Sequence, residues 1–122
     1  MNVFIVEDQE WFLDQLKALV AGVRNAHLVG GADSAQTAIA GIGACNPDVV
    51  LVDLKLSKGT GFEVLRSVRA RSPQTHLPVV TSFPTAGVKK ACMIGGAHGF
   101  FDKLLELDQV RDTLENLSVV LN

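Results

Sequence analysis

Short apolar runs recur along this chain, and each gap between them is long enough to hold one helix. The runs begin near Val3, His27, Val49, Leu77 and Gly99. Runs of four to six residues rich in Val, Ile and Phe are typical of buried strands. A regular alternation of such runs with helix-length gaps predicts βα units and a parallel sheet.

Helical periodicity fills the gaps. Apolar residues spaced three and four apart mark one face of a helix. Ser34 is the expected N-cap of a second helix, and Thr60 with Glu63 has the pattern of a capping box for a third. The apolar faces are Phe12, Leu16, Leu19, Val20 and Val23; Ala38, Ile39 and Ile42; Phe62, Leu65 and Val68; and Leu107, Val110, Leu114, Leu117 and Leu121.

The segment from Pro84 to Gly96 predicts the weakest helix. Pro84 suits a first turn, Gly87 falls inside the segment, and Gly95-Gly96 suits its end. Its apolar face contains Val88, Cys92 and Met93. A face this small buries little surface, so we expect this helix to be the most mobile of the five.

Polar residues follow four of the apolar runs at the points where strands should end. Glu7 and Asp8 follow the first run, Asp53 the third, Thr81 the fourth and Lys103 the fifth. In open α/β sheets, ligands bind at the carboxyl edge of the strands. Three clustered carboxylates repel one another and favour a divalent cation such as Mg²⁺, whereas a lysine and a hydroxyl suit a phosphoryl group. The pattern therefore predicts Mg²⁺-dependent phosphate chemistry.

Each of these residues also has a simpler interpretation. Glu7 and Asp8 could cap the first helix, Lys103 could pair with the acids, and Thr81 could merely end a strand. Asp53 ends the most apolar run, and an aspartate carboxylate can act as a nucleophile that forms an acyl phosphate. The coincidence of five polar positions at one edge favours the functional interpretation.

This arrangement resembles the receiver domain of response regulators in two-component signalling, over the whole chain. The family has an acidic pair after strand one, a phosphoacceptor Asp after strand three, Thr or Ser after strand four and Lys after strand five. Glu7 and Asp8, Asp53, Thr81, and Lys103 match these positions. Gly61-Phe62-Glu63 also matches the segment that follows the phosphoacceptor, and Phe100 matches the switch aromatic.

The resemblance implies a fold and a site. The fold would be flavodoxin-like (βα)5: residues 1–122 as one receiver domain, a five-stranded parallel sheet in order 2-1-3-4-5, and helices on both faces. Asp53 would be phosphorylated, with Lys103 and Thr81 assisting. Glu7, Asp8, Asp53 and the main-chain carbonyl of Lys55 would hold Mg²⁺.

The resemblance also implies partners and a switch. A sensor histidine kinase or a His-containing phosphotransfer protein would donate the phosphoryl group. The protein would be a signalling protein rather than an enzyme, although it would promote its own phosphotransfer and autodephosphorylation. Thr81 and Phe100 would repack the face of the fourth helix, fifth strand and fifth helix, which a downstream protein reads. Lys55 and Phe83 would flank the phosphoryl group and slow its hydrolysis.

Two positions depart from the family pattern. Ser57 and Leu104 stand where proline is common. The lysine–proline bond at the second place is commonly cis in the family, but a cis bond before a non-proline residue costs roughly 2.5–4 kcal/mol. We therefore predict a trans bond between Lys103 and Leu104 and a different loop after the fifth strand.

Composition excludes several classes of protein. Of 122 residues, 48% are hydrophobic and 20% charged, which is typical of a globular domain. The net charge of −2 and the scattered basic residues argue against direct nucleic-acid binding. Because no apolar run is long enough for a membrane helix and no leader pattern opens the chain, we expect a cytoplasmic location. Cys45 and Cys92 are interpreted as reduced thiols.

Three alternatives remain beside a phosphorylatable receiver. The chain could be a receiver-like interaction module that works without phosphorylation, or a receiver cut from a longer transcriptional regulator. A flavin carrier of the same fold would need a Ser/Thr/Gly-rich phosphate loop after the first strand, where Glu7 and Asp8 would instead repel the phosphate.

Overall fold

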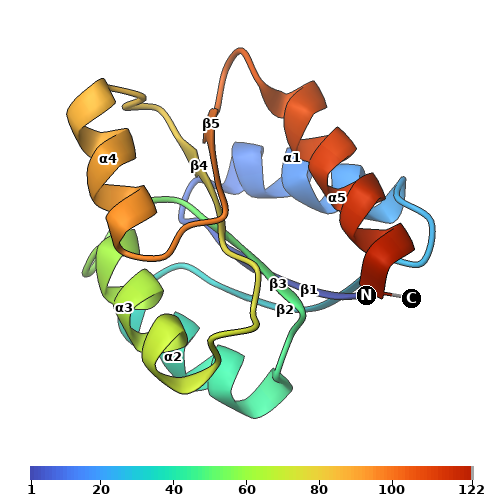
Figure 1. Cartoon of the computed structure of the whole chain (residues 1–122), viewed down its shortest axis with the longest axis horizontal. Coiled ribbons are helices and arrows are strands. Elements are labelled where there is room, and N and C mark those ends of the chain that lie inside the picture. The colour runs from blue at the N-terminus through green and yellow to red at the C-terminus, as the bar shows by residue number, and fades with distance from the viewer. Residues whose placement is uncertain (122) are drawn as a thin grey trace.

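A computed structural model describes residues 1–121, and it shows a five-stranded sheet between two layers of helices (Figure 1). The elements alternate strictly along the chain, as the spacing of apolar runs predicts. They are β1 (Asn2–Val6), α1 (Glu10–Ala21), β2 (His27–Ala32), α2 (Ala35–Cys45), β3 (Val49–Val52), α3 (Gly61–Arg71), β4 (Pro78–Thr81), α4 (Ala86–Ile94), β5 (Gly99–Asp102) and α5 (Leu107–Leu121).

All strand pairs are parallel, and their order is β2-β1-β3-β4-β5. This is the flavodoxin-like order that the family resemblance implies. Strand order reverses between β1 and β3, which are direct neighbours with Val6 paired to Val52. The residues after these two strands therefore lie together at the switch point, where ligands bind in such sheets.

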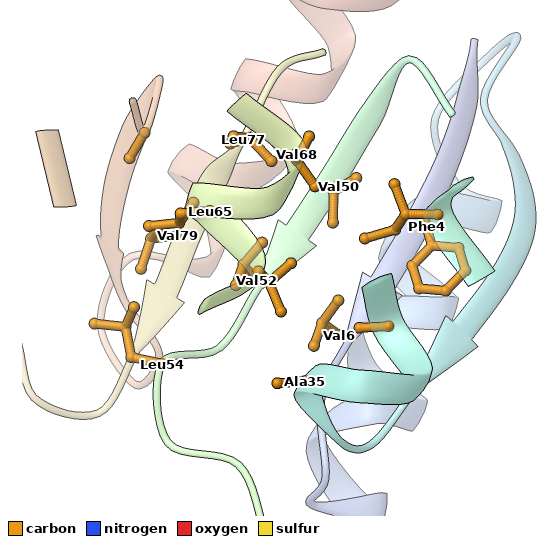
Figure 2. Close-up of a cluster of buried hydrophobic side chains, with 14 of the residues drawn as sticks. Phe4, Val6, Ala35, Val50, Val52, Leu54, Leu65, Val68, Leu77 and Val79 are labelled. Carbon is orange, nitrogen blue, oxygen red and sulfur yellow. The ribbon is translucent and has the colours of Figure 1, made fainter. Parts of the chain in front are cut away.

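Side chains alternate across the sheet and supply two apolar cores. Phe4 and Val6 point to the layer of α2, α3 and α4, whereas Val3 and Ile5 point to the layer of α1 and α5. In Figure 2, Leu65 and Val68 of α3 lie over the first of these faces, beside Val50 and Val52 of β3. Burial of a Leu or Phe side chain contributes about 1.5–3 kcal/mol. Both faces of the sheet are thus anchored by apolar packing.

Helix starts follow local capping chemistry. Ser34 Oγ accepts a hydrogen bond from Thr37 N–H (3.2 Å), and Thr60 Oγ1 accepts one from Glu63 N–H (3.4 Å). Both caps agree with the sequence-based prediction. α4 differs, because Thr85 rather than Pro84 begins it, accepting from Val88 N–H at 3.2 Å.

The apolar face of α4 is small, as predicted, with Cys92 buried and Val88 partly buried; Met93, which was expected on this face, is instead 46% exposed. Both cysteines are free thiols, Cys92 buried and Cys45 partly so. Within residues 1–121, none of the helices has the length and apolar character needed to traverse a lipid bilayer.

Candidate functional site

Three acids meet at the carboxyl edge of β1 and β3. Glu7 and Asp8 follow β1, Asp53 follows β3, and one carboxylate oxygen of each lies within 4.8 Å of the others. Glu7 and Asp53 are only 2% and 5% exposed, and Asp8 is half-buried. Charges this close in a partly dry environment repel strongly. The cluster therefore calls for a cation.

A close approach of backbone to backbone fixes the loop that follows Asp53. Gly61 N–H donates to Leu54 O at 2.8 Å. A Cβ at Gly61 would lie 2.3 Å from Asp53 O, so any other residue would displace the chain at the site. The glycine that opens α3 thus lets this helix start directly beneath Asp53.

Lys103, after β5, supplies one cation. Its Nζ lies 2.9 Å from Glu7 Oε1 and 3.2 Å from Asp53 Oδ2. It also donates a hydrogen bond to Gln9 Oε1 at 2.9 Å and lies 4.6 Å from the centre of the Phe12 ring. The lysine side chain is 2% exposed. An ammonium this buried is stable only because acids and an aromatic face surround it.

Glu7 is the least satisfied charged group of the cluster. Its Oε2 accepts from Gln9 N–H at 3.0 Å, so one oxygen does serve the start of α1, as the simpler interpretation proposed. Its Oε1 has no hydrogen-bond partner among the described residues and meets Lys103 only as an ion pair. Burial, opposed by Gln9 N–H and Lys103 and reinforced by Asp53, raises the Glu7 pKa to about 7.

These features fit a divalent metal ion. The cluster contains hard oxygen ligands, an orphaned buried carboxylate oxygen and more negative than positive charge. Mg²⁺ binds through one or two carboxylates and keeps several waters. The half-exposed Asp8 and the cavity beside it leave space for such waters.

An open cavity of about 420 Å³ lies next to the acids. Asp8, Gln9, Asp53, Lys55 and Phe83 are among its lining residues. Lys55 Nζ lies 5.4 Å from the centre of the Phe83 ring, so these two side chains form one wall. The two residues expected to flank a phosphoryl group therefore line this space.

The two expected switch residues are placed differently. Thr81 is completely buried at the end of β4, and its Oγ1 accepts from Phe83 N–H at 3.1 Å. Phe100 of β5 is partly buried and packs against the core on the α4 side. Thr81 is thus joined through the backbone to the cavity wall at Phe83, while Phe100 reaches the layer that contains α4.

The loop after β5 has Leu104 in place of a proline, and side-chain hydrogen bonds determine its shape. Asp102 Oδ1 accepts from Leu104 N–H (2.8 Å) and Leu105 N–H (3.2 Å), and Glu106 Oε1 accepts from Asp102 N–H (2.9 Å). The bond between Lys103 and Leu104 is trans, as predicted, and no peptide bond within residues 1–121 is cis. Leu104 and Leu105 project into solvent, 72% and 83% exposed.

Sequence reasoning missed Gln9 and Phe12 as contacts of Lys103. Gln9 is a polar residue directly after the acidic pair, which was the available signal. Phe12 was predicted as a core residue, and it is one; its ring also faces the Lys103 ammonium, which the sequence pattern did not indicate.

Comparisons with known proteins identify the family of this chain. The model of the response regulator receiver domain matches residues 3–115. The chain belongs to this family. Receiver domains are signalling modules that interact with histidine kinases and phosphotransfer partners, and they bind Mg²⁺ at an acidic pocket.

Individual relatives and solved structures are similar to this chain. The chain is 30% identical over 103 residues to the transcriptional activator DevR/DosR of Mycobacterium tuberculosis, covering 84% of this chain and 48% of that protein. It is similar in structure to the signal receiver domain of a response regulator from Colwellia psychrerythraea (TM-score 0.87, 22% identity, 96% and 97% of the two chains). It is also similar to the response regulator domain of Thermotoga maritima CheB (TM-score 0.84, 23% identity, 97% and 92%). The chain spans about half the length of the first two curated relatives it matches.

Proposed function

We propose that this chain is a phosphorylatable receiver that accepts a phosphoryl group on Asp53 from a histidine kinase or a His-containing phosphotransfer protein. One observation carries the proposal. Asp53 lies within 4.8 Å of two further acids and 3.2 Å from a buried lysine, at the wall of an open cavity. Three acids beside one ammonium on an open cavity suit an anionic group that arrives with a divalent cation.

The transfer is a nucleophilic substitution at phosphorus. An oxygen of the Asp53 carboxylate attacks, an O–P bond forms, and the P–N bond to the donor imidazole breaks with its electron pair leaving on nitrogen. Lys103 neutralises charge on the phosphoryl oxygens, and Thr81 would donate its hydroxyl to one of them. Glu7, Asp8, Asp53 and the Lys55 carbonyl would hold Mg²⁺, which when bound neutralises the acids and the phosphoryl oxygens.

Loss of the group is hydrolysis of the same O–P bond by water. The Lys55 and Phe83 side chains line the same cavity as Asp53. A long cation and a large aromatic ring restrict attacking water, so we expect the phosphorylated form to be relatively long-lived.

Output would pass through α4, β5 and α5. Thr81 and Phe100 would connect the site to this face, near which Ile94 (78%) and Leu105 (83%) are exposed. Exposed aliphatic side chains favour a protein partner. Because curated relatives include longer transcriptional regulators, a covalently attached output domain is the second form that this proposal takes.

Substitution at the phosphoacceptor tests the proposal. We expect incubation with Mg²⁺ and a small acyl-phosphate donor to label the parent, Asp53→Asn to abolish labelling, and Asp8→Asn to reduce it at subsaturating Mg²⁺. Intact-mass spectrometry follows the added phosphoryl group. Asp48→Asn serves as control, since Asp48 accepts from Asn2 N–H at the opposite edge of the sheet. Equal labelling of the parent and Asp53→Asn would refute the assignment, and failure to label the parent with a cognate donor would favour a phosphorylation-independent module.

A further inference from the structure

Most contacts of the Lys103 ammonium come from one short segment. Three of its four contacts come from residues 7–12: the Glu7 carboxylate, the Gln9 amide and the Phe12 ring. The fourth is Asp53 Oδ2, at 3.2 Å. The ammonium thus has one partner on the phosphoacceptor, two on the connection between β1 and α1, and one, Phe12, in the first turn of α1.

Phosphorylation changes only one of these partners. When an O–P bond forms on Asp53, the negative charge of its carboxylate moves to the phosphoryl oxygens. Coulomb attraction would then draw the ammonium from Asp53 Oδ2 toward the phosphoryl oxygens. Its contacts with Glu7, Gln9 and Phe12 keep their charge or dipole, so they can serve as a pivot during this movement.

Gln9 is suited to this task by its place and its chemistry. It is the N-cap of α1, yet its side chain makes no capping hydrogen bond; its amide oxygen instead accepts a hydrogen bond from the Lys103 ammonium. Its backbone N–H is fixed by Glu7 Oε2 at 3.0 Å. An amide oxygen holds the ammonium without adding a negative charge at the cavity wall, where a carboxylate would repel the phosphoryl group.

We propose that Gln9 is a positioning residue that holds the Lys103 ammonium in place to bond a phosphoryl group on Asp53. This inference rests on the proposed function. Gln9 touches the lysine and not the reacting atoms, so its whole effect should pass through Lys103.

The test uses Gln9→Met, which keeps the length of the side chain and removes the amide oxygen. Gln15→Met is the matched control, because Gln15 is an exposed glutamine on the same helix. The probe is beryllofluoride, a phosphoryl mimic, titrated at saturating Mg²⁺. Trp11, the single tryptophan, reports binding, since its ring contacts Phe12 at a centroid distance of 5.4 Å.

We expect Gln9→Met to weaken beryllofluoride binding about threefold to tenfold, as for loss of one hydrogen bond to a charged group at a solvent-accessible position. Gln15→Met should stay within about twofold of the parent. In a Lys103→Met background, adding Gln9→Met should change the residual binding, or the rate of acyl-phosphate labelling, less than about 1.5-fold. An unchanged affinity of Gln9→Met, or an equal loss in both backgrounds, overturns the role of Gln9.

A second measurement separates this inference from the proposed function. In the metal-free protein, the ¹⁵Nζ resonance of Lys103 should shift in Gln9→Met and stay in place in Gln15→Met. If the parent binds beryllofluoride but the resonance does not shift, the positioning role fails and the function stands. If the parent binds no beryllofluoride with Mg²⁺, the proposed function fails and the positioning role fails with it.

Discussion

Charged or titratable groups cluster at both edges of the sheet, buried at the carboxyl edge and more exposed at the amino edge, and the two edges satisfy them in opposite ways. At the carboxyl edge, Glu7, Asp53 and Lys103 bond mainly to one another. At the amino edge, Arg69 of α3 donates to three backbone carbonyls, those of Pro73, Thr75 (3.3 Å) and Gly96 (2.7 Å). We call the second group, Arg69 with His98 and their partners, the amino-edge cluster.

His98 completes the amino-edge cluster. Its Nδ1 accepts from Leu77 N–H at 3.0 Å, which requires an unprotonated nitrogen there. Burial, with Arg69 and His76 nearby, lowers the His98 pKa, and the two histidine rings lie 4.8 Å apart. Gly96 contributes through its backbone: its φ is +101°, and a Cβ there would lie 2.4 Å from the Arg69 side chain.

The difference separates a structural cluster from a functional one. Backbone carbonyls and amides cannot leave the amino-edge cluster without unfolding the loops around β4 and β5. The carboxyl-edge groups can exchange partners, because one Glu7 oxygen lacks a hydrogen bond and two buried acids share one ammonium. A ligand can therefore change the contacts at the carboxyl edge but not those of the amino-edge cluster.

The largest effect should come from filling the close approach beneath Asp53. Gly61→Ala places a Cβ against Asp53 O, and we expect a loss of about 3 kcal/mol or more in unfolding free energy. Gly87→Ala is the matched control in α4, where a Cβ meets nothing within 4 Å and should stabilise by about 0.5–1 kcal/mol. Urea unfolding measures both. Equal effects of the two substitutions would contradict the close approach.

The next largest effect should come from breaking the amino-edge cluster. Arg69→Met removes the donor of three backbone hydrogen bonds. We expect urea unfolding to show a loss of about 2–3 kcal/mol in unfolding free energy, which Mg²⁺ does not restore. The control Arg66→Met changes an exposed arginine on the same helix and should stay within about 0.5 kcal/mol of the parent. If Mg²⁺ restored the unfolding free energy of Arg69→Met, the two edges would not be independent.

A smaller effect of opposite sign should follow from removing one acid of the site. In chelator, Asp53→Ala leaves one buried acid for one ammonium and relieves the repulsion that helps raise the Glu7 pKa. We expect a gain of about 1 kcal/mol, visible as a higher melting temperature, and Mg²⁺ should narrow the difference by stabilising the parent. A lower melting temperature for Asp53→Ala in chelator would contradict a strained acidic pocket.

The last comparison concerns pH, because the stabilities contributed by the two edges should respond to it in opposite directions. The Glu7 pKa is raised from 4.5 to about 7, so its contribution is fully present below pH 4.5 and is lost as pH rises through about 7. The His98 pKa is lowered from 6.5, so its contribution is present above pH 6.5 and is lost as pH falls toward the folded-state pKa.

Unfolding midpoints in chelator between pH 4.5 and pH 8 measure these slopes. Glu7→Gln should remove the loss of stability with rising pH, and His98→Gln should remove the loss with falling pH. Mg²⁺ should suppress the Glu7 slope alone, because a bound cation favours the ionised carboxylate. If the contributions of Glu7 and His98 to stability changed with pH in the same direction, the contrast between the two edges would be refuted.

Much of this molecule was determined by the sequence alone. The strand order, both capped starts of α2 and α3, and the small face of α4 follow from periodicity, local capping and family resemblance. The convergence of Glu7, Asp8, Asp53 and Lys103 could also be predicted, because the carboxyl ends of parallel strands share one edge. These features depend on residues close in sequence or on a topology with few alternatives.

Other features were decided by tertiary structure. Gln9 could be recognised as a contact of Lys103 only once the fold brought residues 94 positions apart together, and His98 gained its role only when Arg69 and Leu77 N–H came beside it. The sequence indicated that the loop at Leu104 must differ, but the Asp102 and Glu106 hydrogen bonds that shape it depend on actual distances. Sequence patterns encode which face a side chain takes, whereas a particular hydrogen bond requires two groups to meet within about 3 Å, and packing of the whole domain sets that distance.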